Sequence, residues 1–262
     1  MNSNSIDLND NNETEESVEI NEHYKKFRTD YFYKQLEKPY QSTKKFFDFL
    51  EKKRLIYKNT SLIDACCGSG VNSFYAHNRF TCNKIIGFDA QMKFINIGNK
   101  YLENNYNFKT NIEFLNLDLF KCPKEFKHLK MDGAICLQTL MLFKDWKKFL
   151  KLLSELNTNW IALSSLFYEG RIEVRQEFDE LDENGESITS FTYTILSIPI
   201  VEKYLKKIGF REVYWERFDI EIDLLRGDIN QIGTYTVLTD EKKRLQMSGP
   251  MTMPWWFVIA KK

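Results

Sequence analysis

The chain has 262 residues, of which 43% are hydrophobic and 28% are charged. This composition excludes collagen-like, disulfide-stapled and largely disordered proteins, and it predicts one sizeable α/β domain with additions. Lysine and arginine (37) balance aspartate and glutamate (37), so the overall charge gives no reason to expect a polyanion such as nucleic acid as partner.

The balanced charge is unevenly distributed along the chain. Residues 1–22 contain seven acidic residues, no lysine, no arginine and very few apolar residues. We expect a disordered acidic tail here, and not a secretory signal, which needs a cation and an apolar core. The remaining 30 acidic and 37 basic residues leave a net charge of +7 on the body of the protein, which suits an anionic or nucleotide-linked small molecule.

The cysteines and the apolar stretches bear on the cellular location of the protein and on its relation to membranes. Five cysteines, an odd number without a C-x-x-C pair or a nearby histidine cluster, indicate reduced thiols, a cytoplasmic location and no metal site. The longest near-apolar stretch, Ala134–Phe143, is well below the ~18 residues of a membrane helix, so we expect no membrane span.

Residues 23–57 form a predicted N-terminal helical lid. Phe46, Phe49 and Leu50 recur at helical spacing, and Pro39 separates this helix from an earlier tyrosine-rich helix. Among the tyrosines, Tyr40 directly precedes the second helix and is the best candidate to close over a ligand. The alternative is that these rings merely cover the sheet.

From residue 58 to residue 262 we expect one catalytic domain, which begins with alternating strands and helices. This order predicts a doubly wound, mostly parallel sheet with helices on both faces and ligands at the carboxyl ends of the strands. The predicted strands are Ser61–Ala65, Lys84–Phe88, Asn111–Leu117, Gly133–Leu137 and Trp160–Ser164, and the predicted helices are Val71–Arg79, Gln91–Asn104 and Asp145–Asn157.

After Ser164 the pattern changes to hairpins. Residues 168–197 and 225–250 are predicted hairpin insertions over the substrate site. The expected elements are a hairpin of 171–180 and 187–197, a helix Ile200–Ile208, a strand Glu212–Leu224, a hairpin around Thr239–Lys243 and a last strand Trp255–Ala260.

The segment Leu62–Gly70 is a strand with an acid, Asp64, followed by a glycine turn that opens a helix. Gly68 and Gly70 permit a sharp turn and a close approach to a ligand, although an ordinary turn with a helix cap is the alternative. No lysine follows Gly70 before Lys84, which excludes a P-loop, and the third glycine of the dinucleotide fingerprint is missing. The acid instead suits a ligand with a cationic group.

Two further acids follow the next two strands. Asp89 is placed to accept hydrogen bonds from the two hydroxyls of a ribose. Asp118, between Leu117 and Leu119, can accept from an adenine amine while the leucines flank the base; a simple turn residue is the alternative. A ribose, an adenine and a positive charge without phosphate are the inventory of S-adenosylmethionine.

These motifs resemble those of the class I S-adenosylmethionine-dependent methyltransferases. The resemblance implies a Rossmann-like sheet of seven strands with an antiparallel last strand, S-adenosylmethionine as cofactor and S-adenosylhomocysteine as product. Met92 is expected to pack on the ribose or to begin the buried face of its helix. The implied cofactor-binding residues are Tyr40, Asp64, Ala65, Cys66, Gly68, Gly70, Asp89, Ala90, Met92, Asp118, Leu119 and Gln138.

The region after Ser164 is similar to methyltransferases found with bacterial surface-polysaccharide genes, which implies methylation of an oxygen on a sugar, nucleotide sugar or capsule precursor. Glu169, Tyr168 and His23 are the candidates for removing the acceptor's proton. The Asn-Pro-Pro-Tyr and Pro-Cys motifs of base-methylating enzymes are absent, so no nucleic acid is expected. A protein or RNA methyltransferase, a non-catalytic cofactor-fold protein and a homo-oligomer stay open as alternatives.

Overall fold

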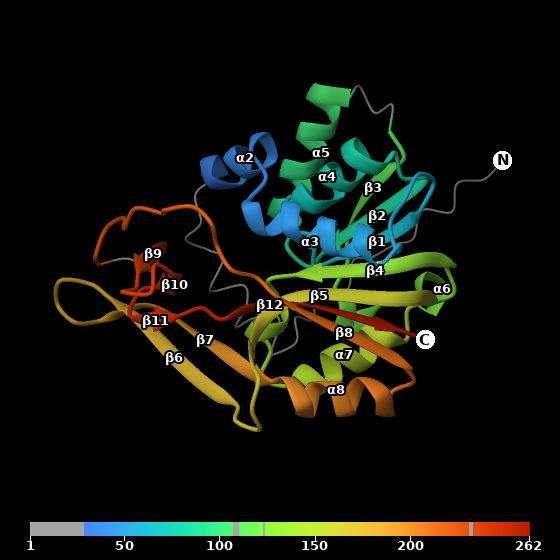
Figure 1. Ribbon diagram of the computed structural model, residues 1–262. Helices are drawn as coiled ribbons and strands as arrows, with labels where there is room; N and C mark the ends of the chain where they lie inside the picture. Colours follow the sequence, from blue (N-terminus) through green and yellow to red (C-terminus); the bar gives the residue numbers. More distant parts are fainter. Residues whose placement is uncertain (1–28, 107–109, 123, 231–232) are drawn as a thin grey trace.

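The protein is described by a computed structural model that covers residues 29–106, 110–122, 124–230 and 233–262 (Figure 1). The predicted acidic tail, residues 1–22, and His23 lie outside the described residues. Within the described ranges, no helix is long and apolar enough to cross a membrane.

A central sheet organises the fold, with its main path in the order β3-β2-β1-β4-β5-β12-β8. Strands β1 to β5 are parallel, and β12 is antiparallel to both of its neighbours, β5 and β8. The predicted sheet with its antiparallel last strand is therefore confirmed. Its strands are β1 (Ser61–Ala65), β2 (Lys84–Asp89), β3 (Ile112–Asn116), β4 (Met131–Leu137), β5 (Thr158–Tyr168), β8 (Glu212–Arg217) and β12 (Trp255–Lys261).

Helices cover both faces of this sheet, which explains why β5 and β12 are buried along nearly their whole length. One face carries α2 (Thr29–Glu37), α3 (Gln41–Lys52), α4 (Val71–Phe80) and α5 (Met92–Tyr106), and the other carries α7 (Trp146–Ser154) and α8 (Ile198–Lys207) (Figure 1). The short helix α6 (Lys124–Lys127) precedes β4. The molecule therefore has three layers.

Local sequence signals explain where these helices begin. Asp145 caps α7 by accepting a hydrogen bond from the backbone N–H of Lys148 at 3.0 Å. Behind this cap, Trp146, Phe149 and Leu150 all face the sheet and are buried. In α8 a proline in the first turn fixes the start at Ile198, two residues before the predicted start.

Two β additions lie beyond the carboxyl ends of the central strands, on the left of Figure 1. The first is the hairpin of β6 (Val174–Leu181) and β7 (Ser187–Ser197), whose last residues pair with the end of β5. The second is a separate three-stranded sheet of β9 (Thr234–Leu238), β10 (Arg244–Ser248) and β11 (Met251–Thr252). Both predicted hairpins are thus present.

The predicted strand Glu212–Leu224 is wrong beyond Arg217, where β8 ends. The ladder with β12 stops at the pair Trp256–Arg217, shortly after Pro254, which has no N–H to donate. Phe218 and Ile220 instead bury their side chains in the core on the α3 side of the sheet.

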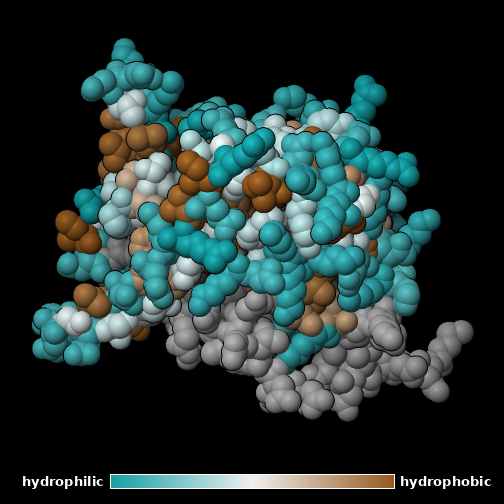
Figure 2. Space-filling model, turned by 90° about the horizontal axis from the view of Figure 1, so that it is seen from below, coloured by the Kyte–Doolittle hydropathy of each residue, from teal (hydrophilic) through white to brown (hydrophobic). Residues whose placement is uncertain are grey.

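The face seen from below in Figure 2 is the one below β6, β7 and α8 in Figure 1. Figure 2 shows this face as mostly hydrophilic, with separate hydrophobic patches. Exposed apolar side chains on the hairpin include Val174, Leu181 and Ile188. Scattered exposed apolar residues of this kind are normal for a protein surface.

Candidate functional site

The glycine loop between β1 and α4 contains three residues with positive φ: Cys66 at 55°, Gly68 at 55° and Gly70 at 84°. The two glycines serve different purposes. A Cβ on Gly70 would lie 2.2 Å from the Phe114 ring, whereas a Cβ on Gly68 would have no atom within 4 Å among the described parts of the chain. Gly70 is therefore required for packing, and Gly68 leaves open space where a ligand can approach the backbone.

Phe114 on β3 is a supporting residue that the sequence analysis missed. Its ring fills the space left by Gly70 and also by Gly87 on β2, where an added Cβ would lie 2.7 Å from the ring. Gly98 on α5 approaches the same ring, at 3.3 Å from an added Cβ. The ring thus holds the loop against β2 and α5. Three glycines on three different elements were the available signal.

Asp64 lies in the middle of the site and is almost completely buried. Its Oδ2 accepts a hydrogen bond from the Ser73 hydroxyl at 2.7 Å, while its Oδ1 has no hydrogen-bond partner in the described structure. Burial raises the pKa of this carboxyl from 3.8 to about 7. The unpartnered oxygen leaves a place for a hydrogen-bond donor or a cation from a ligand.

Asp89 at the end of β2 ties the glycine loop to the next turn. Its Oδ2 accepts from the backbone N–H of Gly68, and its Oδ1 accepts from that of Gln91, both at 2.9 Å. Burial raises the pKa of Asp89 to about 6, these hydrogen bonds lower it, and the charge of Asp118 raises it further. Asn116 supports the turn by donating to the carbonyls of Asp89 and Ala90.

Asp118 follows β3 and caps the short 3-10 helix η1 (Leu119–Lys121) by accepting from the Phe120 N–H at 2.9 Å. The turn role that was the alternative for this residue is therefore real. Because its charge raises the pKa of Asp89, it also belongs to the same electrostatic site. Leu119 beside it is buried.

The three carboxylates at the ends of β1, β2 and β3 form one anionic group, which we call the carboxylate triad (Asp64, Asp89 and Asp118). The charges that raise the pKa of Asp64 and Asp89 are the neighbouring carboxylates themselves. A positively charged ligand lowers the energy of such a group, and an anionic ligand raises it. The residues present therefore fit the sulfonium and ammonium charges of S-adenosylmethionine.

The start of α3 lies against the end of β4. Gln138 directly follows β4 with a φ of 59°, and its side-chain amide donates to the Ser42 hydroxyl at 3.4 Å. Tyr40 is the N-terminal cap residue of α3, is 40% exposed, and accepts a hydrogen bond from Gln35 at 2.9 Å. Both predicted residues thus belong to the same corner of the molecule, and Ser42 was missed.

The surroundings of Met92 and of the adjacent free cysteines Cys66 and Cys67 narrow their roles. Met92 is 53% exposed at the start of α5, so the prediction that it begins the buried face of that helix is wrong. Its packing on the ribose stays a prediction. A hydrogen bond with Cys136, together with burial, raises the pKa of the Cys66 thiol, and burial raises that of Cys67. Such thiols are poorly nucleophilic, which favours a packing role for both cysteines.

Two of the three predicted proton acceptors, Tyr168 and Glu169, lie away from the carboxylate triad. Tyr168 is the last residue of β5, four residues beyond Ser164, which pairs with the end of β4, so it lies ~13 Å farther along the strand. Tyr168 and Glu169 are both exposed, at the base of the β6–β7 hairpin, where Ser197 donates to the Gly170 carbonyl at 2.8 Å. His23 lies outside the described residues. A role in catalysis for these three residues stays a prediction.

Within the described ranges, no cluster of three or more histidine, cysteine, aspartate or glutamate side chains has the arrangement of a metal site. A parallel sheet with an antiparallel last strand and an acid-flanked glycine loop is the architecture of a Rossmann-like methyltransferase. The sequence model of the methyltransferase domain matches residues 56–207, more than half of the chain. The chain belongs to this family, and S-adenosylmethionine is its cofactor.

Solved structures with the same fold share little sequence with this chain. Magnesium protoporphyrin IX methyltransferase (ChlM) from Synechocystis PCC 6803 with bound S-adenosylmethionine has a TM-score of 0.54 at 12% identity, over 97% of this chain and 100% of that chain. The N-terminal domain of EvdMO1, in the presence of S-adenosylhomocysteine and D-fucose, has a TM-score of 0.51 at 12% identity, over 85% and 84%.

A third similar structure is the [4+2]-cyclase SpnF, with a TM-score of 0.51 at 13% identity, over 67% of this chain and 59% of that chain. The fold thus also occurs in a protein named for a different reaction. A search of curated proteins finds no match to this chain.

Proposed function

We propose that this protein transfers the methyl group of S-adenosylmethionine to an oxygen of a small hydroxylated acceptor, which is a sugar, a nucleotide sugar or a capsule precursor. The observation that carries the proposal is the carboxylate triad beside the open side of Gly68. Such a site favours a cation with hydrogen-bond donors and disfavours the phosphates of a nucleotide cofactor.

Each part of the site would hold a different part of the cofactor. Asp89, and Met92 on the exposed start of α5, would contact the ribose, and Asp118 with Leu119 would contact the adenine. Asp64 and the glycine loop would face the charged methionine part. The remaining proposed contacts are Tyr40, Ala65, Cys66, Gly68, Gly70, Ala90 and Gln138.

When bound, S-adenosylmethionine supplies a methyl group already activated on a sulfonium. The chain's own residues then position the acceptor, exclude water and take up the one proton that a hydroxyl acceptor loses, so that the products are the methyl ether, S-adenosylhomocysteine and a proton. Tyr168 and Glu169 at the end of β5, and His23, remain the candidates for this proton.

Several features support a small acceptor. The β6–β7 hairpin and the three-stranded sheet stand beyond the carboxyl ends of the central strands, where α/β proteins bind ligands (Figure 1). The acidic residues Glu173, Glu177 and Asp179 on or before β6 disfavour a bare polyanion such as RNA. D-fucose in the EvdMO1 structure is consistent with a sugar acceptor on this fold.

Cofactor binding tests the proposed site. A hundredfold excess of S-adenosylmethionine over its dissociation constant should stabilise the wild-type chain by about 2.7 kcal/mol, which raises the melting temperature by about 5–10 °C. The Asp89→Asn variant should stay folded and lose most of this shift, because an amide carries no charge and keeps only one of the two acceptor oxygens. Asp219→Asn is a matched control, since Asp219 is 74% exposed and pairs with Arg217 away from the triad.

The alternative functions can be distinguished by identifying which compound receives the methyl group. If labelled methyl groups go to RNA or protein and not to sugars, the acceptor part of the proposal is wrong. If the cofactor binds and no acceptor of any class is methylated, the protein is a binding module or catalyses another reaction, as the SpnF likeness allows.

A further inference from the structure

Three buried polar atoms beyond the carboxyl edge of the sheet have no hydrogen-bond partner in the described structure: Gln176 Oε1, Gln246 Oε1 and Trp255 Nε1. The Trp255 side chain is 7% exposed. Buried polar groups in native proteins are nearly always paired, so three unpaired atoms in one region call for an explanation.

The three side chains come from the elements that enclose this region. Gln176 on β6 pairs across the hairpin with Tyr193 on β7. The backbone carbonyl of Gln246 on β10 accepts a hydrogen bond from the backbone N–H of Met253 at 2.7 Å. The backbone N–H of Trp255 donates to the backbone carbonyl of Met253 at 3.0 Å. Trp255 and Leu196 of β7 pair with neighbouring residues of β5, Leu166 and Phe167. The start of β12 and the end of the hairpin therefore both lie beside the end of β5.

The available chemistry is that of hydroxyl recognition. An amide oxygen accepts a hydrogen bond from a hydroxyl, and an indole N–H donates to one. The ring of Phe178 stacks on Phe191 at 5.2 Å and offers an apolar surface next to Gln176. We propose that this region binds the acceptor as a neutral, polyhydroxylated ring, held by Gln176, Gln246 and Trp255. The inference rests on the proposed function and specifies its acceptor.

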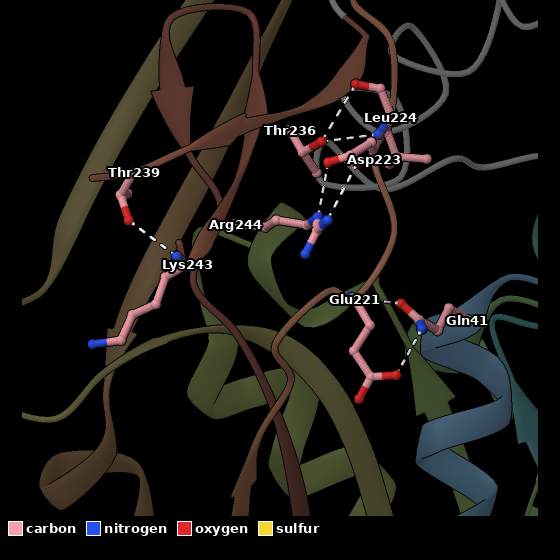
Figure 3. Close-up of polar contacts among 8 residues, drawn as sticks. All are labelled: Gln41, Glu221, Asp223, Leu224, Thr236, Thr239, Lys243 and Arg244. Atoms are coloured by element: carbon pink, nitrogen blue, oxygen red, sulfur yellow. Dashed lines mark hydrogen bonds and ion pairs between the residues drawn. The ribbon is translucent and has the colours of Figure 1, made fainter. Parts of the chain in front are cut away.

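The charges nearby favour a neutral ring over a phosphorylated one. Arg175 pairs with Glu173 at 3.0 Å, and Arg244 makes two hydrogen bonds to Asp223, at 2.8 and 3.3 Å (Figure 3). Both guanidinium groups are thus neutralised by carboxylates of the same region. A phosphate would have to displace these partners, whereas hydroxyl groups would not.

The three-stranded sheet is held to the body on two sides, by buried Met251 and Met253 on one and by exposed polar contacts on the other. Figure 3 shows the exposed side, where the Thr236 hydroxyl accepts a hydrogen bond from the Leu224 N–H and Glu221 is hydrogen-bonded to Gln41 on α3. Lys45 adds an ion pair to Glu221, but these side chains are 43% and 62% exposed. Exposed contacts of this kind are weak, so they can break and re-form during ligand entry.

The experiment measures sugar binding in the full chain saturated with S-adenosylhomocysteine. The probes are the methyl glycosides of glucose, galactose and fucose, compared with glucose 6-phosphate, and binding is followed by saturation-transfer NMR and calorimetry. At least one neutral glycoside should bind more tightly than the sugar phosphate. Trp255→Phe, Gln176→Met and Gln246→Met should each weaken that binding by about threefold to tenfold, the loss of one hydrogen bond.

Thr158→Val is the matched control, because Thr158 Oγ1 is also buried without a partner among the described residues but lies at the opposite end of β5. This variant should bind the glycoside like the wild type. The inference is wrong if no neutral glycoside binds, if the phosphate binds better, or if all three variants bind as the wild type does. Binding of S-adenosylhomocysteine in the same sample keeps such a failure distinct from a failure of the proposed function.

Discussion

The proposed cofactor half, around the carboxylate triad, and the proposed acceptor half, around Gln176, Gln246 and Trp255, differ in how far backbone groups hold their polar side chains. In the cofactor half, Asp89 accepts from two backbone N–H groups and Asp118 accepts from the Phe120 N–H, while Asp64 Oδ1 is buried without a partner in the described structure. In the acceptor half, side-chain atoms of Gln176, Gln246 and Trp255 are buried without partners inside the described structure. The first half is preorganised by its backbone, and the second depends on what packs against it.

The two halves also differ in how their residues are distributed along the sequence. The cofactor half is built from consecutive strand ends within about 55 residues, Asp64 to Asp118, whereas the acceptor half brings together residues 176, 246 and 255 from three elements. A local motif can specify a common cofactor, but a particular acceptor requires tertiary contacts. Single substitutions in each half test this contrast.

Gly70→Ala should be the most damaging single change in the cofactor half. The added Cβ meets the Phe114 ring at 2.2 Å in a backbone with a φ of 84°, so overpacking and strain together should cost about 3 kcal/mol or more in the free energy of unfolding. Gly68→Ala, with open space around it, should cost only about 1–2 kcal/mol. Urea denaturation measures both, and equal losses would contradict the division of roles between the two glycines.

Asp64 should make the stability of the cofactor-free protein depend on pH. With a pKa of about 7 in the folded state against 3.8 when unfolded, the folded protein keeps a proton that the unfolded chain has already released. The free energy of unfolding should therefore fall as the pH rises from about 4 to about 7. Asp64→Asn should remove the Asp64 part of this fall and leave the smaller part that comes from Asp89, whose pKa is raised to about 6. The variant should be more stable at pH 8 by about 1–3 kcal/mol, after a weakening of the Ser73 hydrogen bond.

Calorimetric melts of both proteins across this pH range test the prediction. If the free energy of unfolding depends on pH in the same way for the two proteins, Asp64 is ionised throughout this range and its burial does not destabilise the protein. In the wild type, a cationic cofactor favours the ionised carboxylate, so its binding at pH 6 should release protons, which titrations in two buffers of different ionisation enthalpy detect.

Met92→Ala separates binding from stability. Because Met92 is 53% exposed, its truncation should change the free energy of unfolding by less than about 0.5 kcal/mol. If the side chain packs on the ribose, affinity for S-adenosylhomocysteine should still fall severalfold, by about 1 kcal/mol. Unchanged affinity would remove Met92 from the site.

The smallest effect is expected in the attachment of the three-stranded sheet. Glu221→Gln removes the ion pair with Lys45 but can keep a hydrogen bond with Gln41, so the unfolding free energy should change by less than about 1 kcal/mol at low salt and by still less at high salt. Thermal melts at two salt concentrations provide the measurement. A loss well above this value would show that the sheet is fixed and cannot open cheaply.

The fold could be predicted from the sequence because its signals are local. Strand composition gave both ends of β1 correctly, and the acids at or directly after the ends of the first three strands lie together as the carboxylate triad, whose role in cofactor binding stays a prediction. The failures have tertiary causes. The predicted strand from Glu212 was too long because its end depends on Pro254, which directly precedes the neighbouring strand β12. The exposure of Met92 could not be predicted from periodicity at the start of a helix.

The support of the glycine loop by Phe114 and the contact of Gln138 with Ser42 were missed for the same reason. Each joins residues that are far apart in sequence, and neither follows from a spacing rule. The unpaired atoms of the acceptor half are likewise visible only once β6, β10 and β12 are in place.

The most direct test of the whole account is mass spectrometry of the acceptor after incubation with S-adenosylmethionine and a panel of neutral glycosides, sugar phosphates, nucleotide sugars, RNA and peptides. The wild-type chain should add one methyl group to an oxygen of a neutral glycoside, and Asp89→Asn should add far less at the same cofactor concentration. Methylation of RNA or peptide alone, or no methylation of any compound by a chain that binds the cofactor, would contradict it.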